Sequence, residues 1–375
     1  MKPGILLIGR GNSDWVGGLY YIKNIAFVLM QNNYIVKNYN LFLLVDPENR
    51  DVFDGLNEIK IITMPPKAKR IEKFYRIYLC KIHNIKYMFP CSSKITNFLK
   101  IKGISWIPDF QHNRLTEMYT EEEIAKRTNE SKKIIENGNP LVLSIYDCKN
   151  DVKNFYGREE NVAVVPFVSY IEHDLLLINP KVEKKILEKY HLLNAKYIYV
   201  ANQFWKHKNH IVVFEAAKKL ARDNKDIKIV FTGKLRDPRN PEYIKNLAKY
   251  FEDDELSSIL LNLGFIDREE QIVIMKNANF VIQPSLFEGW GTVVEDAKVL
   301  NKDILLSDIP VHREQKNEKC VFFDPYDSEK LAILIDNENQ KEHRDDIDRG
   351  IKDMYSRAND YSKGFEKLLR DLENK

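Results

Sequence analysis

"NFVIQPSLFEGWGTVVEDAKVL" (residues 279–300) passes from an apolar run through a glycine-containing turn into a segment with helical spacing. The apolar run predicts a buried strand, "LFEGWG" the turn at its carboxyl end, and "TVVEDAKVL" the helix that follows. In open α/β sheets, ligands gather at the carboxyl ends of strands, and the start of a helix offers backbone N–H groups and a positive dipole end. The stretch therefore predicts an anion site at the start of this helix.

Polar and small residues around this turn indicate what the ligand is. Gly289 and Gly291 let the backbone approach a ligand closely, and Glu288 can accept hydrogen bonds from hydroxyl groups. Asp296 lies in the second helical turn and can reach a second pair of hydroxyls. A hydroxyl-rich group, phosphates and a ribose fit these features in order, so the sequence predicts a nucleotide-sugar site.

The same alternation of strand and helix runs through the whole chain and predicts an α/β protein. With 375 residues and 44% hydrophobic content, two domains are expected, and a charged, helix-prone segment near 179–194 separates two sets of strands. We expect an N-terminal acceptor-binding domain over 1–180, a nucleotide-sugar domain over 181–355, and a C-terminal helix over 356–375 that crosses back to the first domain. The predicted strands are "GILLIG", "IKIITM", "IKYMFP", "ISWIP", "PLVLSI" and "VAVVPF" in the first set, and "YIYVAN", "IKIVFTG", "ILLNLGF", "NFVIQPS", "DILLSD" and "KCVFFDP" in the second.

Composition narrows the function classes. The net charge of +3 does not indicate a nucleic-acid binder, and the four cysteines are too far apart for a zinc motif. Asp253 and Asp254 lie in a polar segment rather than at a strand end, so no metal site is expected. No stretch approaches the length of an apolar membrane span, and we expect a cytoplasmic protein.

The segment from Glu288 to Asp296 resembles the E-x7-E element of retaining glycosyltransferases of the GT-B fold, family 4 in particular. The resemblance implies that Glu288 contacts the donor sugar, as a catalytic residue, and that the second acid holds the ribose. Asp296 stands where the family has glutamate, and Glu295 is the second choice. The backbone between the acids is implied to contact sugar and phosphate, through Gly289, Trp290, Gly291, Thr292 and Val293.

A second segment, "VANQFWKHKNHIVVFEAAKKL" (residues 200–220), resembles the R-x4-K element of the same family, whose two cations face the donor diphosphate. Lys208 matches the lysine, but Gln203 stands where the arginine is expected. Three residues remain open as replacements for the missing charge: Lys206, Lys234 and Arg10. The resemblance implies that backbone groups near Gly233 and Phe265 read the base of the donor.

Two segments of the first half also resemble the family. Gly17 and Gly18 match a glycine pair at the start of the first helix, where amides approach the donor phosphate; the alternative is a simple strand-to-helix turn. "SWIPDFQH" matches a loop that bears a histidine near the reacting sugar, so Asp109 and His112 are candidate catalytic residues. For His112, a loop or core position remains the alternative.

The resemblance implies two Rossmann-like domains that face each other across a deep cleft. It also implies a metal-independent hexosyltransferase that needs no cofactor. A sugar is moved from a UDP-, GDP- or dTDP-linked donor to a glycan or lipid-linked glycan, with retention of anomeric configuration, in surface polysaccharide or glycoconjugate synthesis. Two other classes stay open: an NAD-dependent oxidoreductase, for which Gly9 and Gly11 are present but Asp14 breaks the fingerprint, and a non-catalytic nucleotide- or sugar-binding subunit.

A basic stretch, residues 67–102, carries ten Lys or Arg against the single acid Glu72. Phe74, Tyr75, Tyr78 and Leu79 are interleaved with these charges. Such a face suits an anionic membrane, reached as a peripheral contact on its inner side, or a lipid-diphosphate acceptor. The alternative, which we favour slightly from the sequence, is a solvated basic face whose aromatic residues lie in the core.

Overall fold

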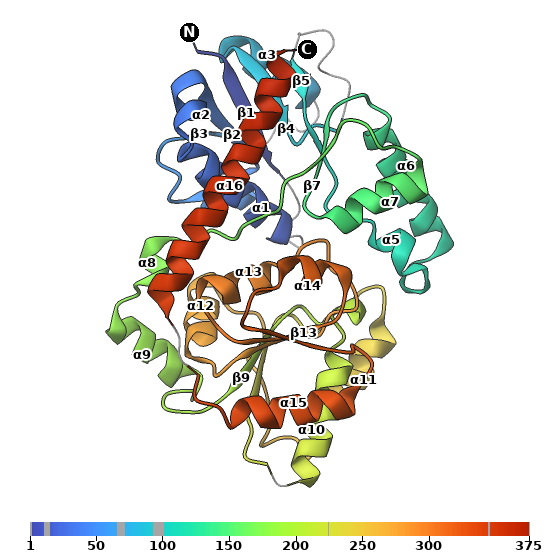
Figure 1. Ribbon diagram of the computed structural model, residues 1–375, viewed down its shortest axis with the longest axis vertical. Helices are drawn as coiled ribbons and strands as arrows, with labels where there is room; N and C mark the ends of the chain where they lie inside the picture. The colour runs from blue at the N-terminus through green and yellow to red at the C-terminus, as the bar shows by residue number, and fades with distance from the viewer. Residues whose placement is uncertain are drawn as a thin grey trace. The chain divides into compact units, whose positions relative to one another are not determined.

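The computed structural model describes residues 2–10, 16–65, 72–92, 101–223, 225–343 and 346–374, and the chain divides into two compact units (Figure 1). The first unit comprises Met1–Arg114, Glu121–Tyr170 and Tyr355–Lys375, and the second comprises Leu115–Thr120 and Ile171–Met354. The first boundary thus lies at Tyr170, earlier than the expected 180. The short segment Leu115–Thr120 belongs to the second unit although it lies within the first domain of the sequence.

The second unit is built on one sheet of six parallel strands in the order β11-β10-β9-β12-β13-β14. All six strands of the second predicted set are present, so the α/β prediction is confirmed. Their bounds are β9 Ile198–Ala201, β10 Ile229–Thr232, β11 Leu260–Asn262, β12 Val281–Gln283, β13 Ile304–Ser307 and β14 Cys320–Phe323. The four central strands β9, β10, β12 and β13 are buried along their whole length, as parallel strands covered by helices on both faces must be.

The helices of the second unit follow their strands in regular alternation. They are α8 His173–Leu176, α9 Pro180–Lys189, α10 His210–Arg222, α11 Pro241–Phe251, α12 Arg268–Asn277, α13 Thr292–Val299, α14 Pro310–Gln315 and α15 Ser328–Asn339, with single 3-10 turns η3 Thr116–Met118 and η4 Lys206–Lys208. Apolar faces of α10 and α15 pack on the sheet in one core that includes Phe204, Phe214 and Phe231. This core fixes the strand ends that carry the polar residues described below.

The first unit has a five-stranded parallel sheet in the order β3-β2-β1-β4-β5 and a three-stranded parallel sheet in the order β6-β7-β8. Its strands are β1 Gly4–Gly9, β2 Asn40–Val45, β3 Lys60–Thr63, β4 Ile85–Phe89, β5 Lys102–Gly103, β6 Ser105–Trp106, β7 Leu141–Leu143 and β8 Val162–Val164. The strand pattern missed β2, which pairs with β1 over six residues at the centre of the sheet. Helices and 3-10 turns of this unit are α1 Val16–Met30, α2 Asn33–Asn38, η1 Pro47–Phe53, α3 Glu72–Ile82, α5 Gln111–Arg114, α6 Glu121–Ile135 and α7 Tyr146–Tyr156.

The longest helix, α16 (Ile347–Glu373), begins in the second unit, and from Tyr355 onward it belongs to the first (Figure 1). There Asn32 Nδ2 donates to Ser362 Oγ over 3.1 Å, and Phe365 packs edge-on against Phe89. The fully buried Phe365 and Leu369 show that this helix completes the core of the first unit. No helix in the described ranges is both long enough and apolar enough to cross a membrane.

Candidate functional site

The strand order of the second unit reverses between β9 and β12. From β9 the sheet grows through β10 and β11 on one side, and from β12 through β13 and β14 on the other. Ligands of open α/β sheets bind outside the carboxyl ends of the strands at such a switch point. The segment after β9 carries Lys208 in η4, and the segment after β12 carries Glu288, so both predicted residues flank the switch point.

Lys208 and Glu288 form a salt bridge there. Lys208 Nζ lies 2.6 Å from Glu288 Oε1 and 2.8 Å from Oε2, although 80 residues separate them in the chain. Their side chains are 15% and 7% exposed, so the pair is largely removed from water. In such surroundings an ion pair is maintained only when further hydrogen bonds satisfy its polar atoms.

Glu288 has these further bonds. Its Oε1 accepts from Ser285 Oγ over 2.7 Å and from Gln283 Nε2 over 2.7 Å, and Gln283 in turn accepts from Asn202 Nδ2 over 2.7 Å. The donors come from the ends of β9 and β12, so the sheet itself aims the Glu288 carboxylate. Sequence reasoning missed Asn202, Gln283 and Ser285, because polar residues at a buried strand end show their partners only in the fold.

His312 on α14 is a further residue that the sequence did not single out. It is fully buried, and burial lowers its pKa to about 4 despite the opposing effect of the Glu288 charge. Its Nδ1 lies 2.8 Å from the Ser307 carbonyl oxygen, which can only accept, so Nδ1 carries the proton. Nε2 is then a buried acceptor, without a hydrogen-bond partner among the described residues.

Close backbone packing shapes the other side of the switch point. Gly233, after β10, has φ +135°, and a Cβ there would lie 2.2 Å from the Asn202 carbonyl oxygen. Only glycine fits this position, where the chains leaving β9 and β10 touch. Gln203 follows Asn202, and its Oε1 accepts from the Lys234 backbone N over 2.8 Å.

Among the three proposed replacements for the missing arginine, Lys234 lies beside Gln203, and its Nζ stands over the Phe265 ring at 5.2 Å from the ring centroid. Phe265 is 54% exposed. Arg10 is instead bound by two carboxylates, with Asp46 at 2.8 Å and Glu72 at 2.6 Å. Its charge is already balanced, so the structure does not favour Arg10 as the replacement.

The start of α13 is held by a side chain from α14. Gln315 Nε2 donates to the Gly291 carbonyl oxygen over 3.1 Å, and the Gly291 N–H points back to Gln315 Oε1 at 3.4 Å. The Trp290 indole Nε1 is buried and has no hydrogen-bond partner in the described part of the chain. Thr292 and Val293 form the first turn of the helix, and Gly289 lies in the turn before it.

The two acidic residues that are candidates for binding the ribose, Asp296 and Glu295, have different neighbours. Asp296 accepts from Arg268 in a two-pronged ion pair, with both nitrogen–oxygen distances at 2.6 Å. Glu295 is fully buried and bonds to Lys298 and Gln315, each over 3.1 Å. Because Arg268 opens the helix that follows β11 and Phe265, Asp296 faces the side of the sheet predicted to read the base, and Glu295 faces α14.

Replacing Arg268 by methionine is expected to lower the free energy of unfolding by about 3 kcal/mol, because Asp296, with its side chain 2% exposed, would lose its charged partner. A urea titration followed by circular dichroism measures this. Arg313→Met is the matched control: Arg313 also grips an aspartate, Asp308, with two nitrogens, but its side chain is 65% exposed. The control should cost less than about 1 kcal/mol. Equal losses of unfolding free energy in the two variants would contradict the view that the Arg268–Asp296 pair is buried and the Arg313–Asp308 pair is exposed.

The predicted residues of the first unit lie in two places. Gly17 and Gly18 form the start of α1, after β1, where this unit's strand order reverses between β1 and β4. A Cβ at the exposed Gly17 would meet no heavy atom within 4 Å in the part of the chain that is described. Among the described residues, packing does not require glycine at position 17, and an approach of the donor phosphate to this helix start stays a prediction. Gly11 and Asp14 lie outside the described residues.

Asp109 and His112 belong to a polar cluster around α5. Asp109 Oδ1 accepts from the Gln111 backbone N over 3.0 Å, which fixes the turn into the helix. His112 is 4% exposed, its Nε2 lies 3.5 Å from Tyr156 Oη, and burial lowers its pKa. This is the buried position that the sequence left open as the alternative, and a role of either residue at the reacting sugar stays a prediction.

Arg114 anchors the same short helix to α7. It donates to Asp151 over 2.7 Å and to Asp147 over 3.0 Å. Burial raises the pKa of Asp151 to about 6, opposed by Arg114 and supported by the nearby Asp147 and Asp109 charges. Sequence reasoning missed the contacts of Arg114, because its two partners lie 33 and 37 residues away in the chain.

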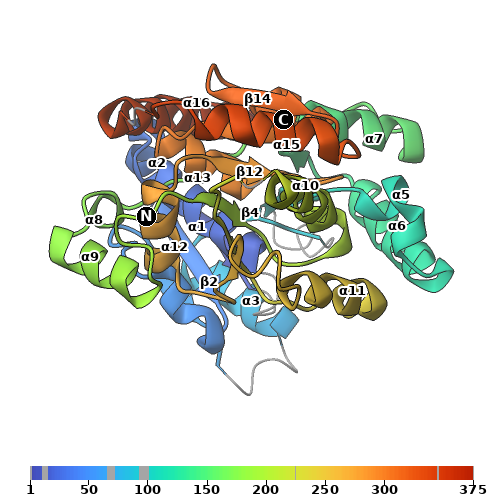
Figure 2. The ribbon, with the colours of Figure 1, turned by 90° about the horizontal axis from the view of Figure 1, so that it is seen from below.

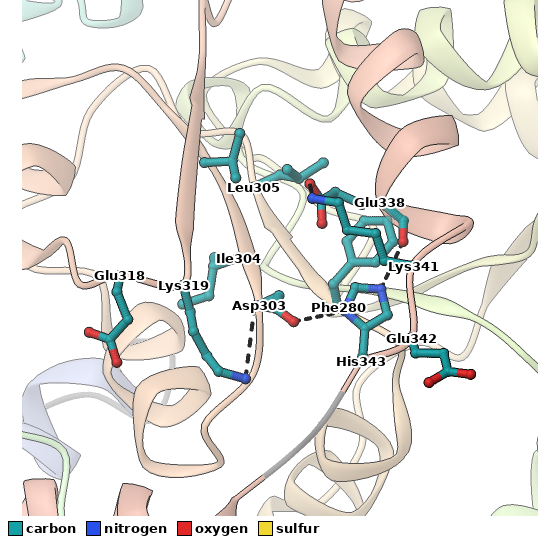
Figure 3. Close-up of a pocket in the computed structure, with 11 residues that line it drawn as sticks. Phe280, Asp303, Ile304, Leu305, Glu318, Lys319, Glu338, Lys341, Glu342 and His343 are labelled. Carbon is teal, nitrogen blue, oxygen red and sulfur yellow. Dashed lines mark hydrogen bonds and ion pairs between the residues drawn. The ribbon is translucent and has the colours of Figure 1, made fainter.

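A cavity of about 160 Å³ opens at the opposite edge of the second unit's sheet (Figure 3). It lies at the amino ends of β13 and β14, where Asp303 bonds to His343 Nδ1 over 2.8 Å and lies 3.8 Å from Lys319 Nζ. His343 Nε2 also lies 2.8 Å from the Glu338 carbonyl oxygen. The pKa of His343 is raised, chiefly by its hydrogen bond to Asp303. This cavity is separate from the switch point. The described ranges hold no group of three or more His, Cys, Asp or Glu that could bind a metal ion.

Comparisons with known proteins show what this chain resembles. Residues 182–354 match the family model "Glycosyl transferases group 1". The O-antigen chain mannosyltransferase RfbU of Salmonella typhimurium is 24% identical over 221 residues, which cover 59% of this chain and 57% of that protein. The chain therefore spans little more than half the length of this curated relative.

Solved structures extend the likeness to the whole chain. The glycosyltransferase of Rickettsia africae superposes with a TM-score of 0.69 at 17% identity, covering 99% of this chain and 97% of that one. Anabaena HepE in complex with UDP-glucose gives 0.68 at 13% identity, covering 99% and 100%. The chain has the GT-B fold, and its residues 182–354 are similar to the glycosyl transferases group 1 family.

Proposed function

We propose that the chain is a retaining glycosyltransferase of the family 4 type. It would transfer a hexose from a UDP-, GDP- or dTDP-linked donor to a glycan or lipid-linked glycan in surface polysaccharide or glycoconjugate synthesis, on the cytoplasmic side. The observation that carries the proposal is the Lys208–Glu288 salt bridge at the switch point, beside the start of α13. The mannosyltransferase activity named for the Salmonella relative and the UDP-glucose bound by HepE support it.

The salt bridge suggests how donor binding prepares the site. In the structure, Lys208 and Glu288 neutralise each other. A diphosphate carries about two negative charges and competes for Lys208 through charge-assisted hydrogen bonds. Glu288 then exchanges its lysine for hydroxyl groups of the donor sugar, while Ser285 and Gln283 keep its carboxylate in place.

The diphosphate, ribose and base of the donor lie in turn along the carboxyl ends of the strands. The diphosphate meets the backbone N–H groups and the positive dipole end at the start of α13. The ribose lies near the Asp296–Arg268 pair, as the resemblance to the family's second acid implies. The base lies near Gly233 and the exposed ring of Phe265, with Lys234 supplying the cation that Gln203 lacks.

In the proposed reaction, the acceptor hydroxyl attacks the anomeric carbon on the face from which the phosphate departs. The leaving phosphate takes the acceptor's proton, so no side chain is needed as a general base. The protein's contribution is positioning and electrostatic stabilisation of the developing positive charge at the sugar. Glu288 is the carboxylate placed for this stabilisation, and no metal ion or further cofactor is required.

A thermal-shift series with UDP, GDP and dTDP and their sugars tests the proposal. One nucleotide family should raise the melting temperature by about 5 °C at about 100 times its Kd, because it binds only the folded protein. With that donor, transfer to a panel of polysaccharide precursors should proceed equally in EDTA, and proton NMR should find the new linkage in the donor's anomeric configuration.

Each other outcome has a definite meaning. A melting shift with NAD alone would replace the proposal with an oxidoreductase. A shift with a nucleotide sugar but neither transfer nor donor hydrolysis would leave a binding subunit. Transfer with inverted configuration would keep the transferase and remove the retaining mechanism.

A further inference from the structure

Helix α3 of the first unit has two apolar faces. One face packs inward: Leu79 and Cys80 are 2% and 4% exposed and, with the partly buried Tyr75, join the core formed by Leu6 and Phe42. The other face looks outward. Phe74, Tyr78 and Ile82 are 70%, 55% and 44% exposed.

The outward residues form one stripe. They are spaced four apart, so they lie above one another along the same side of the helix. Single exposed apolar residues are ordinary on protein surfaces, but two aromatic rings and an isoleucine in a row are a patch. The inward face already attaches α3 to the core, so the fold does not need the stripe. We name Phe74, Tyr78 and Ile82 the α3 stripe.

The segment that carries the α3 stripe is strongly basic in sequence. Glu72 is the only acid between residues 67 and 102, and it is held by Arg10 at 2.6 Å and by Arg76. Lys81 is exposed, next to Ile82 and three residues after Tyr78. Of the ten basic residues in this segment, Lys67, Lys69, Arg70, Lys94 and Lys100 lie outside the described residues, as does the side chain of Lys73; the sequence alone establishes their charge.

We propose that the α3 stripe docks the protein on an anionic lipid bilayer. Phe74, Tyr78 and Ile82 would enter the boundary between headgroups and acyl chains, where aromatic rings are favoured, and Lys81 would remain among the anionic headgroups. Charge complementarity selects this occupant, because each lysine near an anionic surface adds attraction that an uncharged surface does not give. The inference is independent of the donor chemistry proposed for the second unit.

Co-sedimentation with vesicles tests the α3 stripe. The full chain should bind vesicles of phosphatidylcholine and phosphatidylglycerol in equal parts, bind pure phosphatidylcholine vesicles much more weakly, and dissociate at high salt. F74S/Y78S should weaken binding to the anionic vesicles at least about tenfold, and Lys81→Glu should weaken it without touching the apolar residues. The matched control is Tyr326→Ser, because Tyr326 is 79% exposed but belongs to the second unit. That variant should bind like wild type.

Three results would overturn the inference: no binding of the wild type to anionic vesicles, equal binding of wild type and F74S/Y78S, or equal binding to charged and uncharged vesicles. Light scattering on the same samples separates another occupant. A dimer that F74S/Y78S converts to a monomer, with vesicle binding unchanged, would assign the α3 stripe to a second copy of the chain. Near-wild-type circular dichroism of the variants establishes that each comparison is between folded proteins.

Discussion

Replacing Glu288 by glutamine is expected to lower kcat/KM for sugar transfer by about 10²-fold or more, because the carboxylate that stabilises positive charge at the sugar is lost. Glutamine has nearly the same shape, and its amide oxygen can still accept from Ser285. The affinity for the nucleoside diphosphate should stay the same or rise, because Lys208 no longer has to break an ion pair before it binds the diphosphate. Initial rates of transfer and calorimetric titration with the diphosphate measure the two effects.

Glu183→Gln is the control for this variant. Glu183 in α9 also forms a partly buried ion pair, with Lys276 Nζ at 2.8 Å, but it lies outside the switch point. Its substitution should leave kcat/KM within about twofold of wild type, as expected for a carboxylate that touches no substrate. A Glu288→Gln enzyme with near-wild-type kcat/KM would remove Glu288 from the site.

Replacing Lys208 by methionine should weaken binding of the nucleoside diphosphate, whereas Glu288→Gln should leave it unchanged or strengthen it. The affinity for the nucleoside diphosphate should fall about 10- to 100-fold, the value of one hydrogen bond to a charged group. The rate of sugar transfer should fall with this affinity, because the donor must be bound before its sugar can be transferred. Calorimetric titration of wild type and variant with the best nucleoside diphosphate gives the ratio directly.

Methionine also leaves the buried Glu288 without its cation, so Lys208→Met should be less stable than wild type. Lys276→Met removes the cation of the Glu183 pair in the same way and controls for this loss. It should lower stability but leave the affinity for the diphosphate unchanged. Equal affinities in Lys208→Met and wild type would place the diphosphate elsewhere.

Much of the second unit could be predicted because its strands are short apolar runs separated by Gly, Pro, Asn and Asp. Strand β2 was missed because the stretch that contains it has asparagines but no glycine or proline to mark its ends. Between Ala26 and Val45 the chain is largely apolar with no glycine or proline, and periodicity alone does not separate a short helix from a strand there. The structure divides this run at Asn32, whose side chain accepts from the Ile35 backbone N and caps α2.

In the site, too, single residues could be predicted from their own segments, but the contacts between them depend on the fold. Lys208 and Glu288 follow their strands closely, so the position of each could be read from its own segment. Their salt bridge and the pairing of Asp296 with Arg268 join residues 80 and 28 positions apart, and no local pattern encodes such contacts. The aspartate in place of the expected glutamate was the one visible signal, and Arg268 provides a physical reason for it.

The basic stretch illustrates a further limit of pattern reasoning. Phe74, Tyr75, Tyr78 and Leu79 all looked like members of one apolar side, set either in the core or on a membrane face. The structure separates them: Tyr75 and Leu79 pack inward, and Phe74 and Tyr78 are exposed. Four residues within two helical turns can face different surroundings, and the direction of each depends on which face of α3 meets the sheet.

A crystal structure of the chain with the nucleoside diphosphate that raises its melting temperature most is the decisive measurement. The diphosphate should lie within hydrogen-bond distance of Lys208 Nζ and of backbone N–H groups at the start of α13, with the Lys208–Glu288 distances longer than the present 2.6 and 2.8 Å. A diphosphate bound in the cavity around His343, or anywhere else with the salt bridge intact, would contradict a donor site at the switch point.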